Sequence, residues 1–152
     1  MYSENLKSLG ITIPAAPLPL AAYVPAVKTG KYVYTSGQLP MKDGKLAFAG
    51  RVGADVSQED GKLAAEICGI NCISAALTVI GDVDKIARVV KLTAFINSAA
   101  GFTSQPEVAN GASELMIKIF GDNGKHARSA VGVSELPRNA AVEIEMILEV
   151  KE

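Results

Sequence analysis

A strict alternation of apolar and polar residues marks the stretch from 142 to 149 as a strand with one buried face. Its apolar positions point to one side, whereas Glu143 and Glu145 point to the other. Residues 126–135 form a second strand-like run, and the connector Leu136-Pro137-Arg138-Asn139 joins the two. These two runs carry the side chains on which a functional interpretation depends.

The first part of the chain predicts a helical turn, an arm and a hairpin. Residues 1–20 begin with a short polar segment that suits one helical turn, and three prolines in six residues then predict an extended arm. Strand formers fill residues 21–27 and 31–35, and the Thr29-Gly30 pair between them predicts a hairpin turn.

A long helix is predicted from Gln58 to about Val79, ending before Gly81. Ser57 is suited to cap its first turn, and acidic residues follow directly. Gly69 lies inside the helix, where glycine costs up to about 1 kcal/mol relative to alanine, and close packing on a sheet would explain it. The spacing of six apolar residues predicts one buried stripe: Leu63, Ile67, Ile70, Ile73, Leu77 and Ile80.

The order of the central elements indicates an α/β (α+β) fold in a single domain, residues 1–152. Residues 88–97 are almost continuously apolar, which predicts a central strand covered on both faces or at a subunit contact. A strand, the long helix and this strand form a βαβ unit with a right-handed crossover. Pro106 is well placed in the first turn of a second helix, which runs to about Phe120.

Composition adds expectations about surface and location. The chain has 152 residues, of which 49% are hydrophobic and 20% charged, so we expect a substantial core and some surface buried in an oligomer. A net charge of −1 argues against a broad binding surface for nucleic acid or anionic membranes. No apolar run approaches the roughly 20 residues of a membrane span, and residues 1–20 do not resemble a signal peptide. A cytoplasmic protein is therefore expected.

The cysteines and the histidine suggest little chemistry. Cys68 and Cys72 are four residues apart in the long helix, and we interpret them as small core residues. A disulfide at this spacing is awkward, and no clustered ligands complete a zinc site. His126 is the only histidine, for which we expect an exposed or capping position rather than the role of a base. No metal site is therefore predicted.

Arg128 and Glu143 are the pair that suggests chemistry. Arginine can bind a carboxylate through two parallel hydrogen bonds, and glutamate can orient water or move a proton when its pKa is raised. Together they would bind a small 2-oxo or 2-imino acid. The alternative is that Arg128 pairs with a surface acid and that Glu143 is an ordinary exposed residue. Similarly, Ser36-Gly37 either presents a hydroxyl and backbone N–H groups to a ligand or forms a simple turn.

The spacing of this pair limits how it can act. If the two final runs formed a tight hairpin centred near Arg138, Glu143 would lie opposite residue 133, and Arg128 would lie about 17 Å further along the strand. The two side chains can therefore meet only if the strands pair differently or if the site forms between subunits. The second case predicts an oligomer with shared sites.

Two separated motifs give the chain a resemblance to a known family. The stretch A-R-S-A-V-G-V-S-E-L-P-R-N-A-A-V-E-I-E, from Ala127 to Glu145, is similar to the C-terminal signature of the Rid/YjgF family. These are the reactive-intermediate deaminases, earlier classed as translation inhibitors or L-PSP endoribonucleases. The stretch G-K-Y-V-Y-T-S-G-Q-L-P, from Gly30 to Pro40, resembles the family's N-terminal strand and turn.

The resemblance implies a chorismate mutase-like fold, in which a mixed sheet packs on two helices, and a homotrimer around a central barrel with clefts between subunits. It implies hydrolysis of enamine or imine intermediates, such as 2-aminoacrylate, to a 2-oxo acid and ammonia without a metal or organic cofactor. Arg128 would then clamp the substrate carboxylate, and Glu143 would position water or shuttle a proton. Tyr23, Ser36 and the backbone N–H of Gly37 would line the pocket.

Departures from the family pattern indicate a divergent branch. Ala130 stands where many members carry cysteine, and Asn110-Gly111-Ala112-Ser113 stands where many carry an N-x-x-Y pattern. The N-terminal arm is also longer than in the compact members. Two alternatives therefore remain: a non-catalytic protein that binds small carboxylates, and an endoribonuclease, which the acidic charge balance disfavours.

Overall fold

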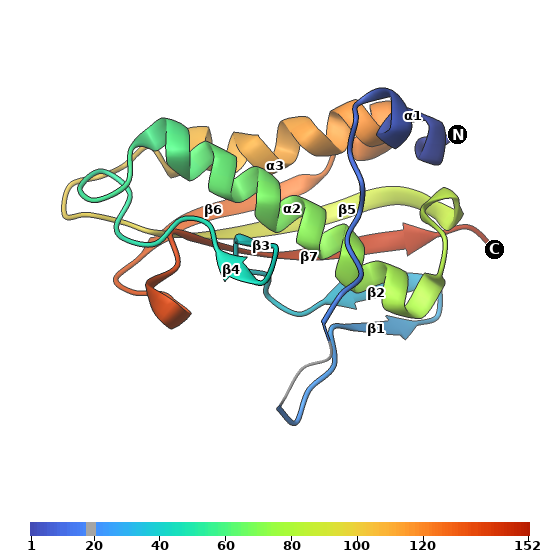
Figure 1. The fold of residues 1–152 in the computed structure, drawn as a ribbon. Coiled ribbons are helices and arrows are strands. Elements are labelled where there is room, and N and C mark those ends of the chain that lie inside the picture. Colours follow the sequence, from blue (N-terminus) through green and yellow to red (C-terminus); the bar gives the residue numbers. More distant parts are fainter. Residues whose placement is uncertain (18–20) are drawn as a thin grey trace.

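The structure is a computed structural model that describes residues 1–17 and 21–152, so residues 18–20 of the predicted arm lie outside the described part. The helices and strands follow one another along the chain (Figure 1) in the order α1 (Tyr2–Ser8), β1 (Ala26–Thr29), β2 (Tyr32–Thr35), β3 (Met41–Lys42), β4 (Lys45–Leu46), α2 (Gln58–Ile80), β5 (Ile86–Asn97), α3 (Gln105–Phe120), β6 (Ala127–Val133) and β7 (Val142–Val150).

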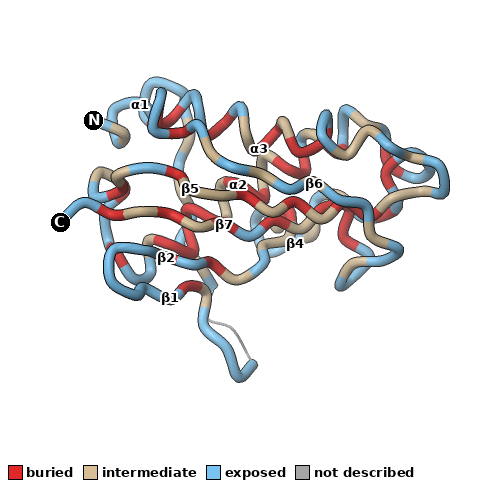
Figure 2. The backbone as a smooth tube through the Cα atoms, turned by 180° about the vertical axis from the view of Figure 1, so that it is seen from behind, coloured by how far each residue is buried: buried red, intermediate tan, exposed pale blue. Residues whose placement is uncertain are grey.

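Five strands form one mixed sheet in the order β1-β2-β7-β5-β6, and β3 pairs with β4 alone. All neighbours in the sheet are antiparallel except β5 and β6, which are parallel and are connected through α3. Helices α2 and α3 lie side by side on one face of the sheet (Figure 1), and the view from behind shows the other face without a helix over it (Figure 2). The expected mixed sheet packed on two helices is thus confirmed.

The strand pairing decides several of the sequence predictions. The β1–β2 hairpin forms as predicted, with Gly30 at φ 56° in its turn. A hairpin between β6 and β7 does not form, because β5 lies between them. The predicted βαβ unit also forms, since β2 and β5 are joined through α2 and are parallel, with β7 between them and antiparallel to both. Finally, α2 and α3 cover only one face of β5, so of the two alternatives for this strand the subunit contact stays a prediction.

The limits of α2 follow the sequence prediction closely, but its buried face does not. The Ser57 hydroxyl accepts a hydrogen bond from the Asp60 N–H at 3.0 Å, and Gly81 ends the helix at φ 77°. Leu63, expected in the buried stripe, is instead 50% exposed. The buried positions are mostly small residues, which let α2 approach its neighbours closely: Gly61, Ala64, Ala65, Cys68, Gly69, Cys72, Ile73, Ser74, Ala75, Ala76 and Ile80.

Glycines set the contact between α2 and α3. A Cβ placed on Gly69 would lie 3.3 Å from the Cβ of Ala112, so Gly69 packs on α3. The sequence analysis had expected it to pack on the sheet. A Cβ placed on Gly111 would collide with the backbone carbonyl oxygen of Lys62. Gly111 therefore lets the backbones of the two helices touch directly.

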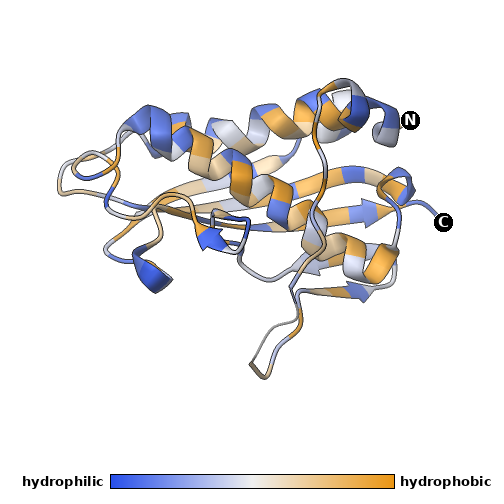
Figure 3. Cartoon of the chain, in the orientation of Figure 1, coloured by the Kyte–Doolittle hydropathy of each residue, from blue (hydrophilic) through white to orange (hydrophobic). Residues whose placement is uncertain are grey.

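The composition of α2 also qualifies the expectation about membranes. By length and mean hydropathy (1.8) α2 would be able to cross a membrane, contrary to the sequence prediction that no run comes close. Figure 3 shows hydrophobic positions along much of this helix. However, 56% of that window is buried inside the fold, which is typical of the core helix of a soluble protein.

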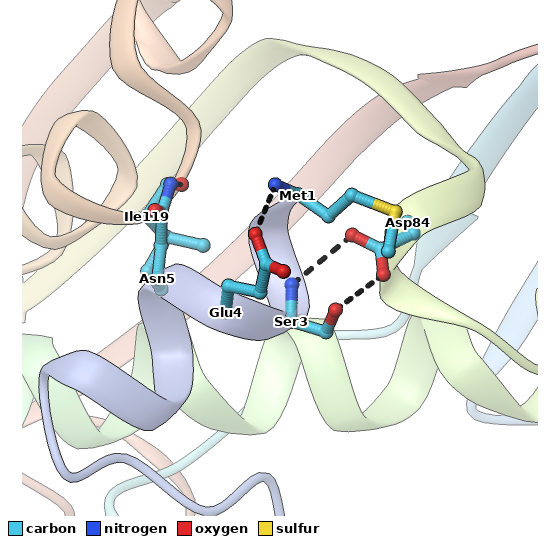
Figure 4. A network of polar contacts seen from close by, with 6 residues as sticks. All are labelled: Met1, Ser3, Glu4, Asn5, Asp84 and Ile119. Carbon is cyan, nitrogen blue, oxygen red and sulfur yellow. Dashed lines mark hydrogen bonds and ion pairs between the residues drawn. The ribbon is translucent and has the colours of Figure 1, made fainter.

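Helix α1 and the arm hold the helical layer together. The predicted helical turn is a complete short helix, whose Ser3 donates from its backbone N–H (3.0 Å) and its hydroxyl to the carboxylate of Asp84 (Figure 4). These bonds hold the pKa of Asp84 below its ordinary value. Asn5 donates to the Ile119 carbonyl at 2.7 Å, which ties α1 to the end of α3. Further along, Ser74 of α2 donates to the carbonyl of Pro14, which fastens the arm to α2.

Candidate functional site

The Ser36-Gly37 turn is fixed against the start of β7. Gln38 and Ile144 exchange two backbone hydrogen bonds, at 2.7 Å and 3.0 Å, directly after the turn. This places Gly37 beneath the side chain of Glu143, where an added Cβ would lie 2.5 Å from Oε1. A side chain at position 37 would therefore push the Glu143 carboxylate out of the place that it occupies.

Glu143 has the electrostatic character of a proton acceptor. It lies opposite Phe95, on the sheet face away from the helices, and is half-buried. Burial raises the pKa of the Glu143 carboxyl above its ordinary value, and the nearby charge of Glu145 raises it further. A carboxylate with a raised pKa takes a proton from water more readily than an ordinary one.

Hydrogen bonds from Ser36 hold the segment that carries Tyr23 beside the Ser36-Gly37 turn. The Ser36 hydroxyl donates to the Val24 carbonyl at 2.6 Å, and the Ser36 N–H donates to the Pro25 carbonyl at 2.8 Å. The segment that carries Tyr23, which is 59% exposed, is thereby held beside the turn. We call Tyr23, Ser36, Gly37 and Glu143 the glutamate half-site.

Arg128 lies elsewhere, on the edge strand β6, with its side chain toward α3. Its Nη1 donates to Asn110 Oδ1 at 2.8 Å and to Ser113 Oγ at 3.1 Å. Asn110 and Ser113 are three residues apart and therefore lie on one side of α3. The sequence analysis missed these contacts. The three-residue spacing of Asn110 and Ser113, in the stretch that departs from the family pattern, could have indicated them.

His126 extends this group of side chains. Its Nδ1 lies 2.6 Å from the Gly124 carbonyl oxygen, and its Nε2 lies 2.8 Å from Ser113 Oγ. Burial lowers the pKa of His126, and the charge of Arg128 lowers it further. Of the two expected positions, an exposed one is wrong because His126 is half-buried, whereas its bond to the Gly124 carbonyl fits a capping position; the bond to Ser113, a neighbour of Arg128, was not expected. We call Asn110, Ser113, His126 and Arg128 the arginine half-site.

A single chain does not bring the two half-sites together. Arg128 pairs with Leu92 of β5, whereas Glu143 pairs with Phe95, three residues further along. One intervening strand and three residues place the two Cα atoms about 14 Å apart. Moreover, Leu92 is buried beneath the helices, so Arg128 and Glu143 project from opposite faces of the sheet. The strands do pair differently from the simple hairpin, yet this pairing does not join the two side chains.

The surface around the half-sites is open and partly apolar. The two edges of the sheet are β1 and β6, and each carries an exposed apolar side chain: Val27 on β1 and Val131 on β6. Tyr34 of β2 is also exposed, at 45%. A cavity of about 790 Å³ lies between the arm and α2, but none of the predicted site residues lines it. Among the residues that the structure describes, no three His, Cys, Asp or Glu side chains cluster as a metal site would require.

Comparison with known proteins places this geometry in context. A sequence profile of the family described as "YjgF/chorismate mutase-like, putative endoribonuclease" matches residues 3–150. The chain is 33% identical over 138 residues to a 2-iminobutanoate/2-iminopropanoate deaminase of Dermatophagoides farinae, covering 91% of this chain and 93% of that protein.

Two further relatives are more similar but have no activity in their names. Protein TCP17 of Trypanosoma cruzi is 44% identical over 148 residues, covering 97% of this chain and 92% of that protein. The crystal structure of Atu1372 from Agrobacterium tumefaciens, described as having unknown function, superimposes with a TM-score of 0.92 at 44% identity. That superposition covers 99% of this chain and 92% of the other, so the expected chorismate mutase-like fold is confirmed.

Proposed function

Because this chain belongs to the YjgF/chorismate mutase-like family, we propose that it hydrolyses reactive 2-imino and enamine acids to 2-oxo acids and ammonia. The deaminase name of a relative at 33% identity supports this reaction class. The observation that carries the proposal is the Glu143 carboxylate, half-buried with a raised pKa, above a glycine that leaves it room. No metal or organic cofactor is part of the proposed reaction.

Arg128 provides the complementary chemistry. An imino acid carries a carboxylate next to the reacting carbon, and a guanidinium binds such a group through two parallel hydrogen bonds. In the proposed complex, Arg128 holds the carboxylate and thereby orients the C=N bond. Tyr23, Ser36 and the N–H of Gly37 line the space around the reacting carbon and nitrogen.

The proposed chemistry needs only water and one proton shuttle. Glu143 takes a proton from water as the water oxygen bonds to C2 of the imine, and that proton passes to the nitrogen. The C–N bond of the resulting carbinolamine then breaks, its hydroxyl proton returns through Glu143, and ammonia leaves. With 2-iminopropanoate and water as reactants, the products are 2-oxopropanoate and ammonia.

We further propose that each complete site forms between two subunits of a homotrimer. The separation of about 14 Å and the opposite sheet faces support this arrangement, because a small acid cannot span both half-sites of one chain. The exposed apolar residues at both edges of the sheet also support an interface there. In this arrangement the arginine half-site of one subunit faces the glutamate half-site of the next.

The reaction is tested with 2-iminopropanoate generated in situ from L-alanine by an amino acid oxidase. We expect wild type to accelerate its decay, Arg128→Ala to lower kcat/KM by roughly 100-fold, and Glu143→Gln to lower kcat by roughly 100-fold or more. Arg51→Ala on the exposed surface is the matched control for the arginine variant and should keep most of the rate. A wild type that leaves the decay unchanged, or an Arg128→Ala variant as fast as wild type, would overturn the assignment.

The shared site is tested by mixing two inactive variants. If Arg128→Ala and Glu143→Gln chains are unfolded together and refolded, about a quarter of the interfaces should receive both intact half-sites by random assembly. Activity should then return to about a quarter of the wild-type value. Recovery no greater than the sum of the separate variants would show that the two residues do not act across a subunit boundary.

Measurements of ligand binding and of turnover separate the proposed deaminase from the alternative functions. A non-catalytic binding protein would show saturable 2-oxobutyrate binding, visible as a thermal shift, without turnover. The endoribonuclease in the family's description is not proposed here, because a net charge of −1 does not favour RNA. We also propose a cytoplasmic location, which agrees with two free, buried cysteines.

A further inference from the structure

The hydrogen bonds of Arg128 occupy one nitrogen of its guanidinium. Nη1 carries two N–H groups, and it donates to two acceptors on α3, Asn110 and Ser113. Among the residues that the structure describes, the other three donors of the five have no partner, namely Nε–H and the two N–H groups of Nη2. Nε–H and one N–H of Nη2 point in the same direction, so they form a side-on fork that matches the two oxygens of a carboxylate.

The direction of each hydrogen bond around Ser113 can be worked out from the backbone. The Gly124 carbonyl only accepts, so Nδ1 of His126 must carry a hydrogen and donate to it at 2.6 Å. In the neutral imidazole, Nε2 is then an acceptor, and the Ser113 hydroxyl donates to it at 2.8 Å. With its hydrogen used in this way, Ser113 Oγ presents lone pairs to Arg128, which is what Nη1 requires.

Building on the proposed function, we propose that Ser113 and His126 are positioning residues, which fix the Arg128 guanidinium so that its Nε–Nη2 edge faces the substrate carboxylate. His126 sets the direction of the Ser113 hydroxyl, and Ser113 together with Asn110 sets the rotation of the guanidinium. Neither Ser113 nor His126 touches substrate in this arrangement. Without them, a flexible arginine would have to lose more rotational freedom on binding, which weakens substrate binding but leaves the chemical step at Glu143 unchanged.

The tautomer of His126 is a direct test that needs no turnover. His126 is the only histidine, so its two ring nitrogens can be identified in a long-range proton–nitrogen correlation spectrum without further assignment. At neutral pH we expect the neutral tautomer with hydrogen on Nδ1, as the Gly124 contact demands. A spectrum with hydrogen on Nε2 would overturn the inference, because Ser113 could not then donate to that nitrogen.

Kinetics and binding test the positioning role. Ser113→Ala and His126→Leu should each raise KM for the imine, and Kd for the stable probe 2-oxobutyrate, roughly tenfold, with kcat within about twofold of wild type. His126→Gln should restore most of the affinity, because the glutamine side-chain oxygen can accept from Ser113. Ser104→Ala is the matched control, since Ser104 begins α3 without a side-chain capping bond and should leave KM unchanged.

These outcomes are distinct from a failure of the proposed function. A wild type with neither turnover nor 2-oxobutyrate binding refutes the proposed function, and the tautomer then still tests the bonding of Ser113. If wild type is active, a Ser113→Ala variant with wild-type KM overturns the positioning role. A folded His126→Gln variant no better than His126→Leu would also overturn it, because the role requires an acceptor at that position.

Discussion

Replacing Gly111 with alanine should destabilise the protein, whereas the same replacement at Gly69 should not. Both glycines lie within helices at the contact between α2 and α3, so both changes bring the same gain in helix propensity, up to about 1 kcal/mol. They differ in what the new methyl group meets. At Gly69 it meets the Cβ of Ala112 at 3.3 Å, but at Gly111 it collides with the Lys62 carbonyl oxygen.

The size of the difference follows from these contacts. A side-chain methyl can yield by a few tenths of an ångström, so the strain at Gly69 and the propensity gain should leave the free energy of unfolding within about 0.5 kcal/mol of wild type. A helix backbone cannot yield locally, so α3 must move away from α2. Overpacking of this kind costs about 1–3 kcal/mol, and the propensity gain offsets part of it. We therefore expect a net loss of about 1–2 kcal/mol for Gly111→Ala.

Thermal and chemical unfolding provide the assay. For a chain of this size, a loss of 1–2 kcal/mol corresponds to a Tm lower by about 2–8 °C, whereas Gly69→Ala should stay within about 2 °C of wild type. Gly111 also lies between Asn110 and Ser113 in the sequence, so movement of α3 should raise KM along with the loss of stability. Equal Tm values for the two variants would refute the close backbone contact as the reason for glycine at position 111.

Three further predictions test other parts of the molecule. Glu143→Gln should raise Tm at neutral pH, because burial makes the charged carboxylate unfavourable in the folded state; the gain should vanish as pH falls through the raised pKa, and a gain independent of pH would contradict this. Burial raises the pKa of both thiols, that of Cys72 to about 12, so Cys68 and Cys72 should react with a thiol reagent only after unfolding, and rapid labelling of native protein would disprove their burial. Asp84→Ala removes the acceptor of both Ser3 bonds, so it should release α1 and increase proteolysis near the N-terminus without changing kcat; unchanged proteolysis would show that these bonds do not hold the helix.

Local rules predicted the limits of the elements but not the burial of α2. Ser57 and Gly81 define the helix ends through capping chemistry that depends only on nearby residues. The buried face of α2 depends instead on how near its neighbours come, and small residues occupy the buried positions because both α3 and the sheet pack against them. Leu63 is left outside for this reason, although its spacing suits a buried stripe.

The sequence indicated candidate site residues, but it did not indicate how they are arranged. Motifs indicated Arg128 and Glu143, and spacing already showed that a simple hairpin cannot join them. The insertion of β5 between their strands is a long-range pairing, which no local pattern encodes. The role of Ser113 and His126 was missed because their contact with Arg128 depends on how α3 lies over β6.

The position of β7 has a consequence for synthesis of the protein. It lies inside the sheet, between β2 and β5, yet it follows both of them in the chain. Until the ribosome has made β7, no strand connects β2 to β5 in the sheet. Helix α2 is likewise uncovered at first, because α3 and the complete sheet are made after it. The segment most similar to a membrane helix is thus without its cover until α3 and the last strand of the sheet have been made. Folding of the complete sheet must therefore follow synthesis of β7. Until then, chaperones have to keep the apolar helix α2 from binding membranes or other chains.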